Sequence, residues 1–198
     1  MKRGILLLSL VLCACSPAEI FPEINNHQPA LEQLVDLVGL QYEVPEGFEM
    51  SPGAANDCLD YEFALRSLSP AIEVRFSLRP LQGIAVEYED PHSSTPNPEH
   101  IYPLMYQSII QKISLDPYAP SGGMGDNALA EHNADWGEIS LLQPKPENNS
   151  DLKSLVFMAL HRQAVGDIYV SVFFDDYESS KSTINQLLKT VKFAQKNK

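Results

Sequence analysis

Cysteine is scarce in this chain of 198 residues, with three copies at positions 13, 15 and 58. The first two stand close together at the end of an apolar N-terminal segment, so Cys58 is the only cysteine in the remainder of the chain. One cysteine cannot close an internal disulfide, which excludes a small scaffold held together by disulfides. We expect Cys58 to be buried as a small hydrophobic side chain.

The chain also lacks the short motifs of several common chemistries. It has no G-x-S-x-G, H-E-x-x-H, C-x-x-C, phosphate-loop or EF-hand pattern. The stretch Gly122-Gly123-Met124-Gly125 is not followed by the Lys and Ser or Thr that a phosphate loop requires. His132 and His161 have no nucleophile paired with them in the sequence, and no family signature of a catalytic thiol surrounds Cys58. The sequence therefore predicts a protein that is not an enzyme and needs no cofactor.

Positive charge is the next deficit, because 14 Lys and Arg residues stand against 26 Asp and Glu residues. All the acidic residues follow Cys15 whereas two of the basic residues precede it, so the chain from Cys15 onward has a formal charge of −14. A surface of this charge repels nucleic acid and anionic lipid headgroups. We expect no nucleic-acid partner, and attachment to a membrane has to rely on something other than charge.

Only one long apolar run is present, the Gly4–Leu12 segment that follows Lys2 and Arg3. A membrane-spanning helix needs about 20 apolar residues, so this run is too short to be one. A positive start and a short apolar stretch that ends in small residues are typical of a removable signal peptide. Residues 1–14 are therefore predicted to be a signal peptide.

The apolar segment ends in Leu12-Cys13-Ala14-Cys15, which resembles the lipobox of bacterial lipoproteins. The resemblance implies that Cys15 becomes the N-terminal residue and carries a diacylglyceryl thioether and an N-acyl group. A single acyl chain binds membranes only marginally, whereas several chains anchor a protein stably. Ser16 rather than Asp follows the cysteine, which by the same resemblance favours the outer membrane, with the domain facing the periplasm. The alternative is ordinary secretion, with cleavage at Ser16-Pro17-Ala18.

The chain beyond the lipid site divides into two parts. Residues 15–29 contain three prolines among polar residues. They are predicted to form an extended tether, which at ~3.1 Å per residue reaches about 40 Å. Residues 30–198 contain no internal repeat and no low-complexity tract, and their number suits one domain with its own hydrophobic core.

Within that domain, the spacing of apolar residues predicts both helices and strands. Two pairs of runs are predicted to form antiparallel hairpins, the first with one face on the core and one face in water. The predicted helices are Ala30–Val38, Ile101–Ser114 and one that begins at Ser179 or Ser180, and the predicted strands are Leu40–Val44, Tyr61–Arg66, Ile72–Arg79, Trp136–Leu142, Leu152–Arg162 and Ile168–Phe174. Residues 87–99, 118–135 and 143–150 are predicted loops. The fold class that follows is α+β, with an antiparallel sheet built from hairpins and packed with helices.

A family resemblance rests on three stretches: Tyr42–Phe48, the strand Ile168–Phe174 with the two Asp residues after it, and Thr190–Phe193. These stretches resemble the PsbP-like family, which includes the DcrB lipoproteins. The resemblance covers about residues 40–194 and carries no catalytic motif. It implies an αβα sandwich that acts as a binding or assembly module on an envelope protein, rather than as an enzyme.

The best candidate for contact with a partner is the segment Pro120–Asp135. Its glycines let backbone groups approach another surface closely, and its short polar side chains suit adaptable hydrogen bonds. Long loops on a rigid scaffold often carry function. The alternative is a plain connector, whose Gly, Asn and Asp residues serve turns. The candidate residues are Met124, Asp126, Asn127, Asn133 and Asp135.

Two other functions stay open on the sequence alone. The segment 87–100 gathers carboxylates and imidazoles that suit Ca²⁺ or Zn²⁺, which would make the protein a metal-binding sensor, but its spacing matches no metal motif. An envelope hydrolase would need an acidic pair in a cleft, and Asp175-Asp176 with Glu178 is one such group of residues. The alternative for the segment 87–100 is a solvated acidic loop without a ligand. The alternative for the acidic pair is an Asp that stabilises the first turn of a helix. No metal ligand and no catalytic residue is assigned.

Overall fold

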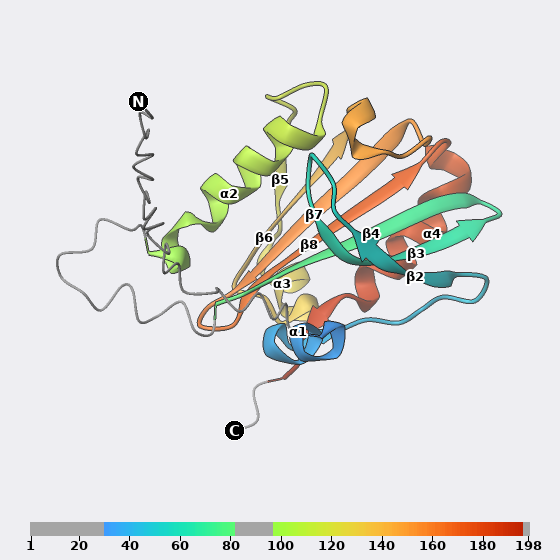
Figure 1. Cartoon of the computed structure of the whole chain (residues 1–198). Helices are drawn as coiled ribbons and strands as arrows, with labels where there is room; N and C mark the ends of the chain where they lie inside the picture. Colours follow the sequence, from blue (N-terminus) through green and yellow to red (C-terminus); the bar gives the residue numbers. More distant parts are fainter. Residues whose placement is uncertain (1–29, 82–96, 196–198) are drawn as a thin grey trace, which may run out of the picture.

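The structure is a computed structural model that describes residues 30–81 and 97–195. Its main element is a seven-stranded antiparallel sheet with helices packed against it, and two further short strands pair with each other (Figure 1). The predicted α+β fold with an antiparallel sheet is thus confirmed. In chain order the elements are α1 (Leu31–Val38), β1 (Leu40–Gln41), β2 (Glu49–Ala54), β3 (Tyr61–Leu68), β4 (Ala71–Pro80), α2 (Pro98–Ile113), β5 (Gly122–Gly123), α3 (Asp126–His132), β6 (Trp136–Leu142), a 3₁₀ helix (Pro146–Asn148), β7 (Ser154–Arg162), β8 (Gly166–Phe174), α4 (Tyr177–Thr190) and β9 (Lys192–Phe193).

The large sheet joins two hairpins that are distant in the sequence. Its strand order is β2-β3-β4-β8-β7-β6-β5, so β8 is the middle strand and β4 and β7 flank it. In the hairpin β3–β4, Leu65 lies opposite Val74, and across the junction of the two hairpins Val74 lies opposite Val172 of β8. Both hairpins are the ones that the alternation of apolar residues predicts.

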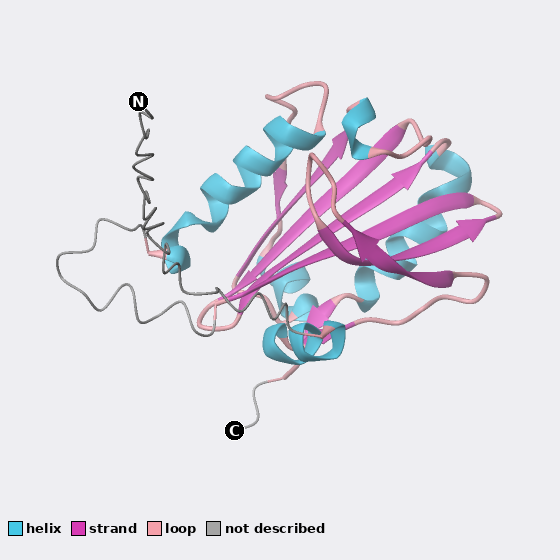
Figure 2. Ribbon diagram, viewed as in Figure 1, coloured by secondary structure: helices cyan, strands magenta, loops and turns pink. Residues whose placement is uncertain are grey.

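The two faces of the sheet carry separate apolar cores. One face packs against α1 and α4, through buried side chains that include Val38 and Leu187. The opposite face packs against α2, whose Tyr106 and Ile110 are fully buried. Figure 2 shows α2 and α4 on opposite sides of the sheet. The central strands are therefore covered on both faces.

The prediction that the first hairpin has one face in water is wrong. The alternation in Ile72–Arg79 places Glu73 and Arg75 on that wet face, yet they are only 9% and 5% exposed. The backbone carbonyls of Asn148 and Asn149 accept hydrogen bonds from Arg75 and so cover it. Alternation shows which residues share a face, but it does not show whether something packs on that face.

One strand, β2, was not predicted. It contains Pro52, which has no N–H to donate and is confined to edge strands and strand ends. β2 is the outermost strand on its side of the sheet, which tolerates the proline. A Cβ atom on Gly53 would lie 1.9 Å from the carbonyl oxygen of Tyr61, so only glycine permits the close approach of β2 to β3. The predicted strand Leu40–Val44 is reduced to the two residues of β1.

The predicted loop 118–135 is also wrong, because it contains β5 and α3. α3 ends at His132 and is capped by Asn133, whose φ of 52° lies in the left-handed region that asparagine tolerates. The last helix begins earlier than predicted. Asp176 caps it by accepting the backbone N–H groups of Glu178 and Ser179, which leaves no capping role for Ser180.

Several predicted features lie outside the described residues. These are the signal peptide, Cys15, the tether to residue 29 and the 87–96 part of the predicted acidic loop. α2 begins at Pro98, so the last two residues of that predicted loop are helical. Among residues 30–81 and 97–195, no helix combines the length and the apolar character needed to cross a membrane.

Candidate functional site

The sheet has an irregular place where β3 and β4 separate. Their regular pairing stops at Phe63 and Phe76, although β4 continues along β8 to its end. Beyond that point the carboxylate of Glu62 accepts the backbone N–H of Leu78 at 2.7 Å. A side chain here takes the place of a backbone carbonyl, which leaves a gap between the two strands.

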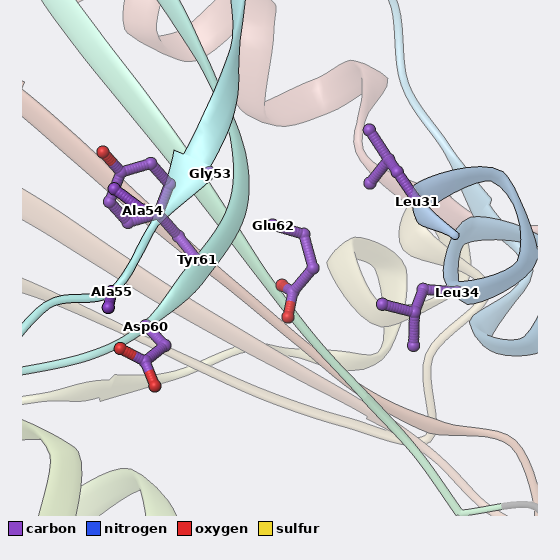
Figure 3. Close-up of a pocket in the computed structure, with 8 residues that line it drawn as sticks. All are labelled: Leu31, Leu34, Gly53, Ala54, Ala55, Asp60, Tyr61 and Glu62. Atoms are coloured by element: carbon purple, nitrogen blue, oxygen red, sulfur yellow. The ribbon is translucent and has the colours of Figure 1, made fainter. Parts of the chain in front are cut away.

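A pocket of about 330 Å³ lies nearby, between α1, the end of β2 and the start of β3. Figure 3 shows Leu31 and Leu34 of α1 on one side of it and the side chains of Asp60 and Glu62 on the other. Burial raises the pKa of the Glu62 carboxyl, the hydrogen bond from Leu78 opposes this shift, and the charge of Asp60 adds to it. Glu62 therefore keeps its proton to a higher pH than an exposed glutamate does.

A second pocket, here called the α2 pocket, has a volume of about 370 Å³ and lies on the α2 side of the same gap. Its walls come from the segment 56–62, from β4, from β8 and from one face of α2. The pocket is lined by side chains of both charges and by the buried hydroxyl of Tyr169, among others. These side chains are Asp57, Asp60, Glu62, Arg79, Lys112 and Tyr169.

A buried carboxylate holds the arginine of this pocket in place. Asp167 of β8 is 1% exposed, and its Oδ2 accepts hydrogen bonds from Arg79 Nη1 at 3.0 Å and from the Tyr169 hydroxyl at 3.2 Å. Its Oδ1 lies 2.7 Å from His161 Nδ1. The buried Asp167 carboxylate thus holds the guanidinium of Arg79 in position, while the Arg79 side chain remains 26% exposed. A guanidinium has five N–H donors, so it keeps donors for a ligand.

α2 covers this network with an aromatic ring. The ring of Tyr102 stacks on His161 with 4.0 Å between the ring centroids, and it also contacts Trp136. The sequence predicts that His161 faces either solvent or a hydrogen-bonded neighbour. The second alternative holds, since His161 is 3% exposed and bonds to Asp167.

Two other groups of the α2 pocket stay protonated at neutral pH. Cys58 is buried as predicted, and burial together with the charge of Glu147 raises the pKa of its thiol. A buried thiol with a raised pKa is a poor nucleophile. Burial and the adjacent Asp167 charge raise the pKa of Tyr169, so its hydroxyl remains a hydrogen-bond donor.

The five residues predicted to contact a partner do not form one exposed group. Met124 is half-buried and packs against the core on the α1 and α4 side. Asn133 and Asp135 use their side chains to bond backbone groups of β9 and of the β7–β8 turn, at 2.7 and 2.8 Å. Asp126 and Asn127 lie exposed at the start of α3. Three of the five thus have structural contacts, and partner binding through the segment stays a prediction.

The acidic residues before α4 serve that helix and its surroundings. Asp176 accepts two N–H groups of the first turn, and Asp175 accepts one from the segment before β7. The acidic residues that line both pockets are Asp60 and Glu62 instead. In the described part of the chain, no group of three or more His, Cys, Asp or Glu side chains is placed to hold a metal ion, and residues 87–96 lie outside it.

The sequence reasoning missed Arg79, Asp167 and Glu62. The register of the second hairpin places Asp167 opposite His161, so pairing the two strands on paper would have found that contact. Arg79 also lies opposite Asp167, but across the junction of β4 and β8. No local signal reveals that junction, because the two strands belong to separate hairpins.

Comparisons with known proteins do not indicate a function for this chain. No family model, no curated protein and no solved structure matches the chain. A function therefore has to follow from the residues of the site and from the N-terminal segment.

Proposed function

We propose that this chain is a lipid-anchored binding module of a bacterial envelope, held at the outer membrane with its domain in the periplasm. The signal segment and the lipobox-like sequence that ends in Cys15 support the anchor. The formal charge of −14 opposes attachment to anionic lipid, so the acyl chains have to hold the domain at the membrane. The resemblance to PsbP-like proteins supports a role in binding or assembly.

We infer that the ligand enters the α2 pocket, and the observation that carries this is the fixed position of its charged groups. Arg79 is oriented by a buried carboxylate before any ligand arrives. Pre-oriented polar groups bind with a smaller entropy loss than mobile ones. Met105 and Ile109 of α2 add an apolar wall. A pocket of about 370 Å³ with an apolar wall and a few fixed polar groups has the make-up of a small-molecule site.

Replacing Cys15 by alanine tests the anchor. Lipid transfer precedes cleavage at a lipobox, so Cys15→Ala is expected to accumulate as an unprocessed or mislocalised precursor, measured by gel mobility and membrane fractionation. Cys13→Ala is the matched control, because Cys13 leaves with the signal peptide and its loss should not prevent processing. Normal cleavage and release of Cys15→Ala would show ordinary secretion instead.

Blocking the α2 pocket tests the binding function. The full lipidated chain in detergent is dialysed against a small-molecule extract of its own cells, and mass spectrometry identifies the components that the protein retains. Ser108 of α2 lines the pocket and is exposed, so Ser108→Trp is expected to fill the pocket and abolish retention. Gln107→Trp is the control, because Gln107 is also exposed on α2 but does not line the pocket. Equal retention by the two variants, or no retention by the unaltered protein, would contradict the proposal.

An envelope hydrolase is the second candidate, and the pair Asp60 and Glu62 favours it. A carboxyl group with a raised pKa near a second acidic residue is a feature of acid catalysis in glycoside hydrolases. The same dialysis separates the two functions. A binding module retains its component unchanged, whereas a hydrolase converts it into smaller products.

A further inference from the structure

The α2 pocket brings anionic and cationic side chains to one cavity. Its carboxylates come from the segment before β3 and from the start of β3, whereas Arg79 comes from β4 and Lys112 from the last turn of α2. Arg79 forms its ion pair with Asp167, behind the pocket, and not with one of the carboxylates that line it. The lining carboxylates and the guanidinium are therefore available together to a ligand that carries both charges.

The Arg79 side of the pocket suits a carboxylate. One guanidinium N–H group is taken by Asp167, which leaves the other donors of the fork for an acceptor. Asp167 is itself held by His161, so the guanidinium cannot easily turn away. Hydrogen bonds between a guanidinium and a carboxylate are among the stronger ones in proteins, and their paired geometry favours a planar ligand group.

The Asp60 and Glu62 side of the pocket suits an ammonium group. Each carboxylate is anchored through one oxygen, which accepts a backbone N–H at 2.7 Å, from Asn56 in one case and from Leu78 in the other. An ionised carboxylate has about four acceptor positions, so each retains capacity for a further donor. Asp57 adds a third negative charge to the same wall.

We propose that the α2 pocket binds a zwitterion, namely a free amino acid or a short peptide with an unmodified amino group and an unmodified carboxyl group. The ligand carboxylate lies on Arg79, its ammonium group lies on Asp60 and Glu62, and an apolar side chain packs on the wall formed by α2. A purely anionic ligand would be repelled by the lining carboxylates, and a purely cationic one by Arg79 and Lys112. This ligand class rests on the proposed function of the pocket as a binding site.

Pools of matched ligands test the proposal on the unaltered protein. The lipidated chain in detergent is dialysed against pools of amino acids and dipeptides with free ends, and against the same dipeptides N-acetylated or C-amidated. Each modification removes one charge, so each is expected to weaken retention about tenfold or more, because hydrogen bonds to charged groups are the ones that are lost. Retention of the modified dipeptides as strongly as of the free ones would overturn the proposal.

Two variants test which protein side chain binds each charged end of the ligand. Arg79→Gln should no longer distinguish a C-amidated dipeptide from a free one, and Asp60→Asn should no longer distinguish an N-acetylated one. Arg66→Gln is the control, since Arg66 does not line the pocket, and it should distinguish both. If a cell component is retained through the pocket but no zwitterion is, the ligand class is wrong and the binding function stands. If neither is retained, the binding function itself fails.

Discussion

Replacing Arg75 by alanine is expected to lower the free energy of unfolding by about 3–5 kcal/mol, a large share of the stability of a single domain. Arg75 is 5% exposed, and its Nε donates to Glu73 Oε1 at 2.7 Å. It also donates to the backbone carbonyls of Asn148 and Asn149. Alanine would remove all three bonds, leaving Glu73 paired only with the exposed Arg66 and the Asn149 carbonyl without its arginine donor, and the loss of a buried charged donor is costly. Denaturant unfolding followed by circular dichroism measures the loss.

Arg75 also connects elements that are distant in the sequence. Its guanidinium lies 4.9 Å from the ring centroid of Tyr61 and 4.5 Å from that of Phe173, so it is in contact with rings from β3 and β8. Cation–π contacts of a desolvated arginine add to its hydrogen bonds. The carbonyls that it binds end the 3₁₀ helix, so its loss should loosen that segment as well as the sheet.

The matched control for Arg75 is Arg66→Ala. Arg66 pairs with the same Glu73 oxygen at 3.2 Å, but its side chain is 54% exposed. Exposed ion pairs contribute little, so this variant should lose about 0.5 kcal/mol or less. The two arginines therefore share an acidic partner and differ in burial. Equal losses would show that burial of Arg75 does not matter to stability.

The contrast between these arginines shows where the sequence stops being informative. The alternation of apolar and polar residues predicts both hairpins and which residues of each strand share a face, because it depends only on neighbouring residues. It places Arg75 on a wet face because nothing local indicates that β4 pairs with β8 from the other hairpin. That pairing puts β4 inside the sheet, and the 3₁₀ helix and its following turn then cover Arg75.

The sequence predicts even less of the candidate site than of the sheet. Tyr61-Glu62-Phe63 continues the alternation of β3, so no residue marks the place where pairing with β4 stops.

The loop prediction for 118–135 failed for a different reason. α3 has seven residues, which is shorter than the window in which helical periodicity can be recognised, and the glycines and asparagine around it are typical of turns.

Phe76→Ala is expected to cost about 3–5 kcal/mol, as large aromatic to alanine changes in a core do. Phe76 has no exposed surface. Its ring stacks on Phe63 with 4.5 Å between centroids and 8° between planes, and the ring of Tyr42 lies 5.4 Å away. Alanine would remove these contacts and leave a cavity under α1, in a place where paired strands limit collapse. The free energy of unfolding from denaturant titration is the measurement.

Leu68→Ala is the control for Phe76, because Leu68 ends the same hairpin and is 95% exposed, so its loss should stay within about 0.5 kcal/mol. The comparison of Phe76 with Arg75 is more informative, since the two are adjacent on β4 and project to opposite faces of the sheet. Similar large losses are what a strand covered on both faces predicts. A large loss for Phe76→Ala with a small one for Arg75→Ala would instead mean that the α2 side of β4 is open to water. That result would also mean that the face of β4 that lines the α2 pocket is not covered, and the pocket depends on that cover.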